Sequence, residues 1–200
     1  MLESAPQRKF TESVEVAVNI KDVDLSIAKN RVEDDVVLPK GRGKTIKVCV
    51  FGSAELAQKA QGVADLVVQP QDIEALAADK RKARQMAAEY DYFIAEAPLM
   101  RVIGARLGAV LGPRGKMPRP VPPGTDPTSI IRNMRSTVRL RSKDKRTFHA
   151  PIGVRTMPAE DLADNLDFLI KRLVAKLERG KFNIHSIYVK TTMGPSVRLI

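Results

Sequence analysis

Small hydroxyl residues and a glycine near the end of the sequence are the side chains whose types and spacing best suit a chemical task. They directly follow a strand-like run and form the segment Thr191, Thr192, Met193, Gly194, Pro195 and Ser196. Glycine lets the main chain approach another surface closely, so hydroxyl and amide groups there can bond phosphates, sugars or 2′-hydroxyls. A plain turn after a strand explains the same residues, and both interpretations stay open.

Catalysis and metal binding lack comparable support. His149 and His185 are the only histidines, and neither has a second ligand at metal-binding spacing. No serine lies in a G-x-S-x-G nucleophile elbow. Cys49 is the only cysteine, which excludes an intrachain disulfide and fits a reducing compartment. We therefore expect no metal and no other cofactor.

Two glycine motifs resemble nucleotide-binding loops only in part. Gly43, Lys44 and Thr45 match the end of a phosphate-binding loop, but Leu38 stands where its first glycine should be. The motif also precedes a strand-like run instead of following one. Gly52 could begin a dinucleotide fingerprint, but no G-x-G-x-x-G follows. The first motif is better interpreted as a hinge with a basic rim.

A second basic segment lies in the middle of the chain. Residues 97–125 contain no acidic side chain, and a loop rich in glycine and proline carries Arg114 and Lys116, with Arg119 just beyond it. Such a loop can contact phosphates, and a solvated loop explains it equally well.

Composition points to a polyanionic partner. The net charge of +11 and the pI near 9.9 favour nucleic acid, with an anionic membrane as the weaker alternative. No run approaches the roughly 18 to 20 apolar residues of a spanning helix, so we expect a soluble, cytoplasmic protein. Tryptophan is absent and aromatic residues make up only 4%, which favours a folded RNA over stacked single-stranded bases.

The elements that must position these residues follow two patterns. Strand-like runs at 45–51, 64–68 and 91–97 alternate with helical patterns at 53–60, 72–89 and 99–107, which is typical of a doubly wound parallel sheet. Outside this region, residues 12–20 alternate polar and apolar, and 31–38 do so more weakly. Residues 138–142 and 146–150 predict a hairpin, 159–179 a helix and 184–191 a last strand. The proline-rich segment 118–127 predicts an extended loop.

Antiparallel patterns on both sides of a βαβαβ centre predict an inserted domain. We expect a discontinuous α+β domain of residues 1–41 and 136–200 with an antiparallel sheet, and an inserted Rossmann-like three-layer α/β domain of residues 42–135. Residues 38–43 connect the first domain to the inserted domain. They contain Pro39, Gly41 and Gly43, which predicts a hinge.

Several segments resemble the L-one family of large-subunit ribosomal proteins in order and spacing, in a short form like that of archaea. They are Lys9 and Phe10 with Ser13 and Glu15, then VVLPKGRGK, LGPRGKMPRP, HAPIG and TTMGPS. The resemblance covers nearly the whole chain. It implies that the discontinuous domain binds RNA through Lys9, Phe10, Ser13 and Glu15, with His149 possible, and through residues 191–196.

The resemblance also implies partners and a place of action. It implies binding to large-subunit ribosomal RNA at the mobile side stalk near the exit site, help in the release of deacylated tRNA, and repression through the protein's own mRNA. The protein would be a monomer when free and would not be an enzyme. Glu15 repels phosphate, so it would have to accept a hydrogen bond from a base amino group or a 2′-hydroxyl.

Two other classes of function remain to be compared. An enzyme that binds a nucleotide in the doubly wound domain would need carboxylates at strand ends, where Glu96 is the obvious candidate. A protein-interaction module would explain neither the charge nor the hydroxyl-rich turn.

Overall fold

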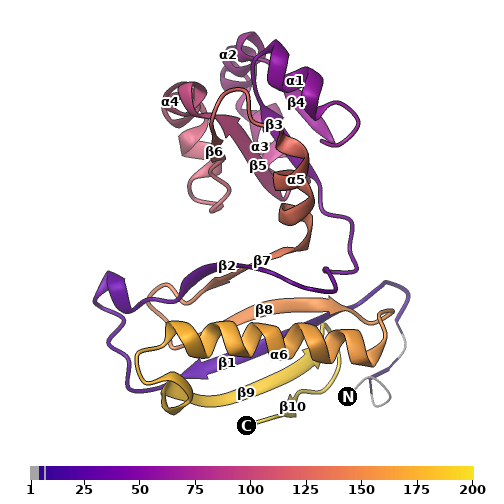
Figure 1. Ribbon diagram of the computed structural model, residues 1–200, viewed down its shortest axis with the longest axis vertical. Helices are drawn as coiled ribbons and strands as arrows, with labels where there is room; N and C mark the ends of the chain where they lie inside the picture. Colours follow the sequence, from indigo (N-terminus) through magenta and orange to yellow (C-terminus); the bar gives the residue numbers. More distant parts are fainter. Residues whose placement is uncertain (1–4, 7) are drawn as a thin grey trace. The chain divides into compact units, whose positions relative to one another are not determined.

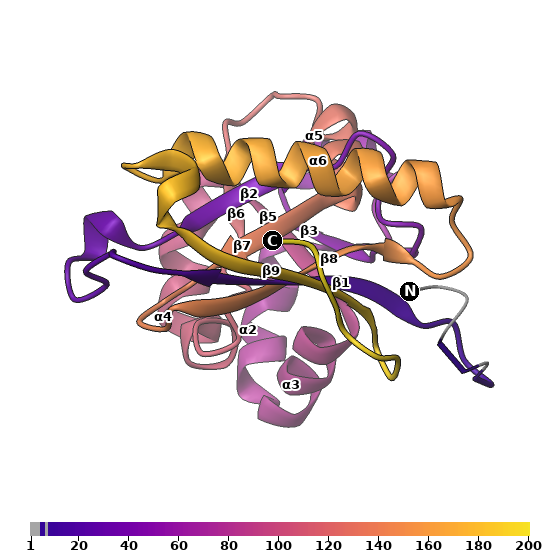
Figure 2. The same ribbon diagram turned by 90° about the horizontal axis from the view of Figure 1, so that it is seen from below.

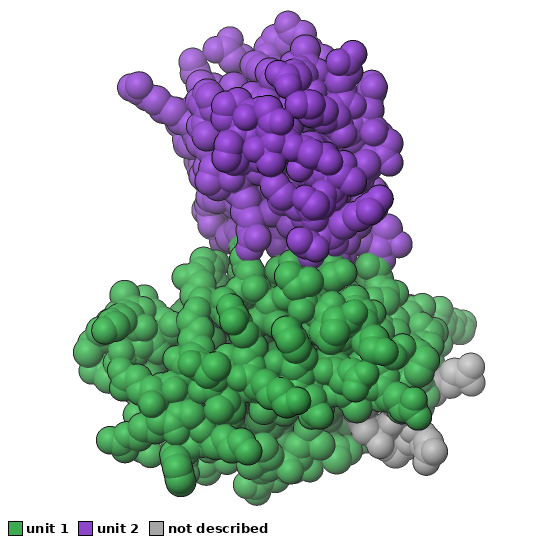
Figure 3. Space-filling view, viewed as in Figure 1, with its two compact units in different colours: residues 1–44, 136–200 green, residues 45–135 purple. Residues whose placement is uncertain are grey.

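The chain forms two compact units in the computed structural model, which describes residues 5–6 and 8–200 (Figure 3). Unit 1 is discontinuous and contains residues 1–44 and 136–200, and unit 2 contains residues 45–135. Residues 42–44 group with unit 1, whereas the sequence interpretation assigned them to the inserted domain.

Unit 1 contains a four-stranded antiparallel sheet (Figures 1 and 2). Its strands are β1 (Ser13–Ile20), β8 (Thr147–Val154), β9 (Ile184–Thr191) and β10 (Val197–Arg198), in the order β10-β9-β1-β8. Along β1, every second residue from Val14 to Ile20 is buried, and the residues between them are partly exposed. One face of the sheet therefore belongs to the core and the other is open.

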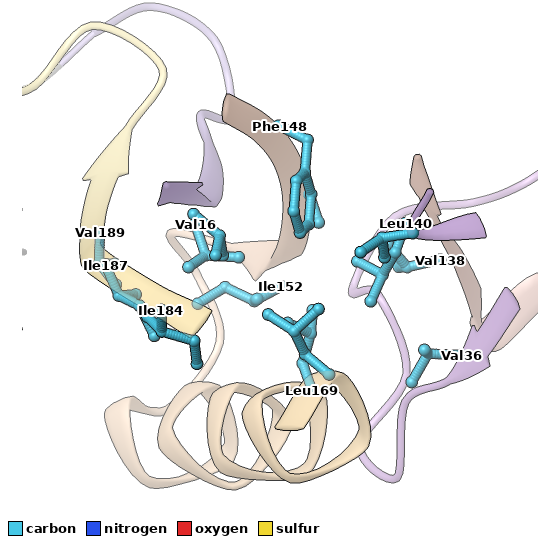
Figure 4. Packing of buried hydrophobic residues seen from close by; sticks show 14 of the residues in the cluster. Val16, Val36, Val138, Leu140, Phe148, Ile152, Leu169, Ile184, Ile187 and Val189 are labelled. Atoms are coloured by element: carbon cyan, nitrogen blue, oxygen red, sulfur yellow. The ribbon is translucent and has the colours of Figure 1, made fainter. Parts of the chain in front are cut away.

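The core of unit 1 lies between this sheet, the helix α6 (Ala159–Lys176) and a two-stranded sheet of β2 (Glu33–Val37) and β7 (Thr137–Arg141). In Figure 4, Leu169 of α6 points toward Ile152 of β8, and Leu140 of β7 closes the same space. Leu169 is fully buried, so truncating it to alanine should cost about 2–5 kcal/mol.

The predicted hairpin of residues 138–150 is wrong. The chain does turn at Lys143, but β7 pairs with β2 and β8 pairs with β1, in separate sheets. Opposite charges explain the choice of β7, because Arg141 lies opposite Glu33 and Arg139 opposite Asp35, each within ion-pair distance. Because the consecutive strands β7 and β8 belong to different sheets, the two sheets together enclose the core.

Unit 2 is a doubly wound α/β structure. Its parallel strands β3 (Val48–Phe51), β4 (Leu66–Val68), β5 (Tyr92–Glu96) and β6 (Arg119–Val121) lie in the order β4-β3-β5-β6. The helices α1 (Ala54–Ala60) and α5 (Pro127–Ser136) pack on one face, and α2 (Pro70–Ala78), α3 (Lys80–Glu89) and α4 (Met100–Leu111) pack on the other. The expected fold class, an antiparallel α+β part with a three-layer α/β part, is confirmed.

Two predicted elements of unit 2 need correction. The long helix expected at 72–89 is two helices, because Asp79 leaves helical geometry and its carboxylate accepts the N–H groups of Arg81 and Lys82 at 3.0 and 3.1 Å. The loop expected at 118–127 contains β6, an edge strand in which Pro120 is tolerated because one side of the strand forms no ladder.

Short 3₁₀ turns complete the described chain at Ala28–Asn30, Ala97–Leu99 and Gly180–Asn183. Among the residues that the structure describes, no helix is both long and apolar enough to cross a bilayer.

Candidate nucleic-acid interface

The two segments singled out at opposite ends of the sequence lie side by side in unit 1. Ser13 begins β1 and Thr191 ends β9, which is its antiparallel neighbour. The N–H of Ser13 donates to Oγ1 of Thr192 at 3.1 Å, and the N–H of Thr192 donates to the carbonyl of Ser13 at 3.0 Å. The pairing of β1 with β9 thus fixes the 191–196 turn onto the start of β1.

Glu12, a buried glutamate that sequence reasoning missed, binds the main chain of the 191–196 turn. Glu12 is only 1% exposed, and its carboxylate accepts the N–H of Met193 at 3.0 Å and Nη1 of Arg155 at 2.9 Å. The hydrogen bond from Met193 is the main cause that holds the pKa of Glu12 below its usual value; burial opposes it and Arg155 adds to it. Only three-dimensional proximity distinguishes Glu12, since in sequence it looks like the first polar residue of the alternating run 12–20.

Arg155 was also missed, and it joins three parts of the chain. Its guanidinium donates to the carbonyls of Ala5 and Pro6 at 2.8 and 2.7 Å as well as to Glu12. Its own N–H donates to the carbonyl of Glu12 at 2.9 Å. Arginine suits this role because its planar donors reach several acceptors at once.

Gly194 is required by the packing of the turn. A side-chain carbon there would overlap Oγ1 of Thr191 and lie 3.0 Å from Cβ of Ala5. The turn can therefore keep its close contacts only with glycine at this position.

Two large apolar side chains flank these polar contacts and remain open to solvent. Phe10 is 54% exposed and Met193 is 58% exposed. Phe10 also lines a cleft of about 420 Å³ together with Arg8, Lys9, Thr11, Glu12, Arg155 and Thr156. Both side chains are therefore available for contact with a partner.

The other predicted strand residues lie on the open face of the sheet. Glu15 lies between Lys190 and Pro151, and Ala17 lies between Tyr188 and His149, so His149 shares a face with Glu15 but not a neighbouring position. Pro195 and Ser196 are exposed beyond the turn. The structure thus joins Ser13 to the 191–196 turn by hydrogen bonds, places Lys9 and Phe10 at the cleft that Glu12 and Arg155 also line, and places Glu15 and His149 on the open face of the sheet.

The predicted basic loop divides into different environments within unit 2. Nζ of Lys116 donates to the carbonyls of Ala87 and Tyr90 at 3.0 and 2.7 Å, at the end of α3. Arg114 is exposed in the turn after α4 and donates to the carbonyl of Val110 in that helix, and Arg119 lies in β6. Lys116 therefore has a structural role, whereas Arg114 faces solvent.

The residues predicted as a hinge are held by unit 1. Gly41 and Gly43 both have positive φ, and a side chain at Gly43 would lie 2.6 Å from Sδ of Met157. Oδ1 of the buried Asn165 accepts the N–H of Lys40 at 3.0 Å, and its Nδ2 donates to the carbonyl of Gly41 at 2.9 Å. Pro39 lies within this held segment.

Glu96, the carboxylate considered for nucleotide binding, is occupied within unit 2. It is buried and accepts Oγ of Ser53 at 2.7 Å. Cys49 is also buried, and burial raises the pKa of its thiol to about 12. In the described part of the chain, no group of three or more histidine, cysteine or acidic residues could hold a metal ion.

Comparison with known proteins gives a consistent result over the whole chain. Residues 2–195 match the model of the ribosomal protein L1p/L10e family. The protein named large ribosomal subunit protein uL1 from Methanocella arvoryzae is 54% identical over 200 residues, which cover 100% of this chain and 94% of the relative. Proteins of the same name from Thermoplasma acidophilum (54%, covering 98% and 91%) and Haloarcula marismortui (48%, covering 99% and 93%) are similar.

Proposed function

Because this chain belongs to the ribosomal protein L1p/L10e family, we propose that unit 1 binds large-subunit ribosomal RNA through the surface where β1 begins and β9 ends. The chain is a large ribosomal subunit protein and a structural component, not an enzyme. The observation that carries the proposal is the pair of hydrogen bonds between Ser13 and Thr192, which unites two segments 179 residues apart.

Each residue has a role that its environment allows. Lys9 contacts phosphate, while Phe10 and Met193 lie against sugars or base faces. The hydroxyls and amides of residues 192–196, with Ser13, bond to 2′-hydroxyls and phosphate oxygens. Glu15 accepts from a base amino group or a 2′-hydroxyl, with Lys190 opposite it to moderate repulsion, and His149 lies at the margin.

Binding at this surface depends weakly on salt. Glu12 is already paired with Arg155 within the protein, Glu15 lies opposite Lys190, and Lys9 is the one cation proposed to contact phosphate, beside hydroxyl, amide and apolar groups. Each phosphate neutralised by a cation changes the log-log salt slope by about −0.7 to −0.9. We expect specific binding to show a slope of small magnitude, and a steep slope in a salt titration would contradict this mechanism.

Met193 provides the direct test. Met193→Glu places a carboxylate on an exposed side chain, so it should abolish specific binding by repelling RNA without disturbing the core. Ile27→Glu is the matched control, because Ile27 is similarly exposed in unit 1 but lies beyond the other end of β1. Binding to a large-subunit RNA fragment should be lost only in the first variant, with unchanged circular dichroism in both. Unchanged affinity of Met193→Glu would remove the turn from the site.

At the level of the ribosome, we propose that the protein lies at the mobile side stalk near the exit site and aids release of deacylated tRNA. The family resemblance supports this role. Crosslinking within whole large subunits, mapped to both protein and RNA, should join residues 191–196 to stalk RNA. Subunits that lack the protein should release deacylated tRNA more slowly, and equal release rates would exclude the role.

The same surface also serves repression of translation. A surface that reads RNA shape by main-chain and hydroxyl contacts can bind any RNA that presents that shape, including the protein's own mRNA. A gel shift with the leader transcript should show a complex that Met193→Glu abolishes. Absence of a complex at concentrations that saturate the ribosomal RNA fragment would contradict repression.

A further inference from the structure

The cleft beside the start of β1 is lined by two planar side chains from distant parts of the chain. Phe10 lies just before β1, and Arg155 follows the last residue of β8. The cleft has a volume of about 420 Å³. Protein pockets that hold a single small ligand usually measure about 300–1,000 Å³. This cleft can therefore hold a ligand as large as one nucleotide, but not a segment of double helix.

Arg155 provides a rigid planar surface at this cleft. Its guanidinium donates to the carbonyls of Ala5 and Pro6 and to the carboxylate of Glu12, at 2.8, 2.7 and 2.9 Å. Because the N–H groups of a guanidinium lie in its plane, these hydrogen bonds run along its edges and not over its faces. The side chain is 27% exposed, and its charge is paired with Glu12. Arg155 therefore suits stacking on a flat ring better than neutralisation of a phosphate.

Phe10 is the second planar group, and its ring is open to solvent. Its exposed fraction is 54%. Among the residues that the structure describes, no aromatic ring and no cation stacks on Phe10. The ring is therefore accessible to a planar ligand in the same cleft that Arg155 lines, and aromatic faces of this kind bind the faces of other rings.

The remaining residues of the cleft match the polar parts of a nucleotide. Lys9 is exposed and forms no ion pair with a carboxylate of the described chain, so its charge is available to a phosphate. Thr11 and Thr156 are also exposed, and their hydroxyls can donate to or accept from the edge of a base. Glu12 lines the cleft as well, but it is 1% exposed and paired with Arg155, so it repels a phosphate only weakly.

We propose that this cleft binds one unpaired nucleotide of the RNA, with its base against Phe10 and Arg155 and its phosphate at Lys9. The inference rests on the proposed function and adds a base-reading subsite to a surface that otherwise reads shape. Unpaired nucleotides of a folded RNA can turn their bases outward, where they stack on aromatic rings or guanidinium groups and hydrogen-bond through their edges. A continuous double helix keeps its bases stacked and cannot fill the cleft. One ring is enough for one base, which agrees with the aromatic content of only 4%.

Abasic substitutions in the large-subunit RNA fragment test this subsite. Each unpaired nucleotide in turn is replaced by one without a base, and the affinity of the full chain is measured by titration. At one position the wild-type chain should lose about tenfold to hundredfold in affinity, which is typical of one base stacked on an aromatic ring. Phe10→Leu should lose a similar factor with the intact fragment, and the same abasic substitution should weaken this variant no further.

Phe182→Leu is the matched control. Phe182 is an exposed phenylalanine of unit 1, but it lies before the start of β9, whereas the turn at 191–196 follows the end of that strand. This variant should bind like the wild-type chain and keep its sensitivity to the abasic substitution. Phe10→Tyr keeps the ring and should also keep that sensitivity. Circular dichroism checks that all variants are folded.

Two results would overturn the inference. In the first, no abasic position weakens binding of the wild-type chain. In the second, Phe10→Leu and the abasic substitution weaken binding by factors that multiply at every sensitive position, so that Phe10 contacts the RNA without holding a base. In either case, specific binding that Met193→Glu abolishes would leave the proposed function intact. If the wild-type chain does not bind the intact fragment specifically, the proposed function fails and the inference fails with it.

Discussion

Glu12 shows how one buried residue can support the surface that we propose binds RNA. Its carboxylate is buried, accepts the N–H of Met193 and is paired with Arg155. Removing one partner of such a group leaves the others unsatisfied, which typically costs about 1–3 kcal/mol. The main chain that carries the exposed Met193 side chain is thus held by a buried charge.

The lowered pKa of Glu12 predicts a dependence of stability on pH. A carboxyl group whose pKa is lower in the folded state stabilises the fold above its unfolded pKa, near 4.5, and loses this effect as pH falls through the folded value. Glu12→Gln should therefore differ most from wild type in free energy of unfolding above pH 4.5, and the difference should shrink below it. Urea denaturation across pH 2–7 measures this.

Glu178→Gln is the control for that titration, because Glu178 is exposed just beyond the end of α6. Its unfolding curve should run parallel to wild type at every pH. If the curve for Glu12→Gln were also parallel, the hydrogen bonds to Met193 and Arg155 would not stabilise the ionised form.

Among the elements, the crossing segment at 38–43 is organised by a helix that lies far from it in sequence. Asn165 of α6 is fully buried and bonds to the main chain of Lys40, Gly41 and Ile152. Lys40 adds an ion pair with Asp161 at 3.2 Å. These contacts fix Lys40 and Gly41 to α6, and the hinge at Pro39, Gly41 and Gly43 stays a prediction.

Asn165→Ala should loosen this segment. It removes the partner of one buried N–H and two carbonyls, which should lower the free energy of unfolding of unit 1 by about 1–3 kcal/mol. Amide hydrogen exchange at Lys40 should become faster. Asp167→Ala, an exposed change on the same helix, should affect neither quantity. Unchanged exchange in the Asn165 variant would show that the segment is held by other contacts.

Elements with strong local periodicity could be predicted from sequence. The alternation in β1 and the apolar positions of α6 specify their buried faces without reference to other parts of the chain. The pairing of β7 with β2 could not be predicted, because it depends on ion pairs between residues more than 100 positions apart. The same applies to the site: the turn at 191–196 carries a local signal, whereas Glu12 and Arg155 acquire their roles only through tertiary contacts.

For the whole molecule, unit 2 is inserted into the chain of unit 1 at a point where the two segments of unit 1 lie next to each other. Val37 of β2 pairs with Thr137 of β7, and the N–H of Leu38 donates to the carbonyl of Ser136 at 3.0 Å. The chain therefore leaves unit 1 and returns to it at neighbouring positions. The two units also have separate hydrophobic clusters.

Replacing residues 45–135 with a short glycine linker should therefore leave unit 1 folded. Its affinity for the large-subunit RNA fragment should stay within about tenfold of the full chain, or 1.4 kcal/mol. Circular dichroism and a binding titration measure these outcomes, and Met193→Glu in the shortened chain should still abolish specific binding. A shortened chain that is unfolded would show that unit 2 is needed for the stability of unit 1.

The pairing of β1 with β8 and β9 also determines the order in which the protein can mature during synthesis. The central strand is made early, but both of its neighbours are made after unit 2 is complete. At 5–20 residues per second, Ser13 waits roughly 10–40 s for Thr192, which follows it by 179 residues. During this interval unit 2 can fold by itself, while the hydrogen bonds between Ser13 and Thr192 cannot yet form. If the surface proposed above binds RNA, a nascent chain can form it only after β9 and the turn that follows β9 have been made.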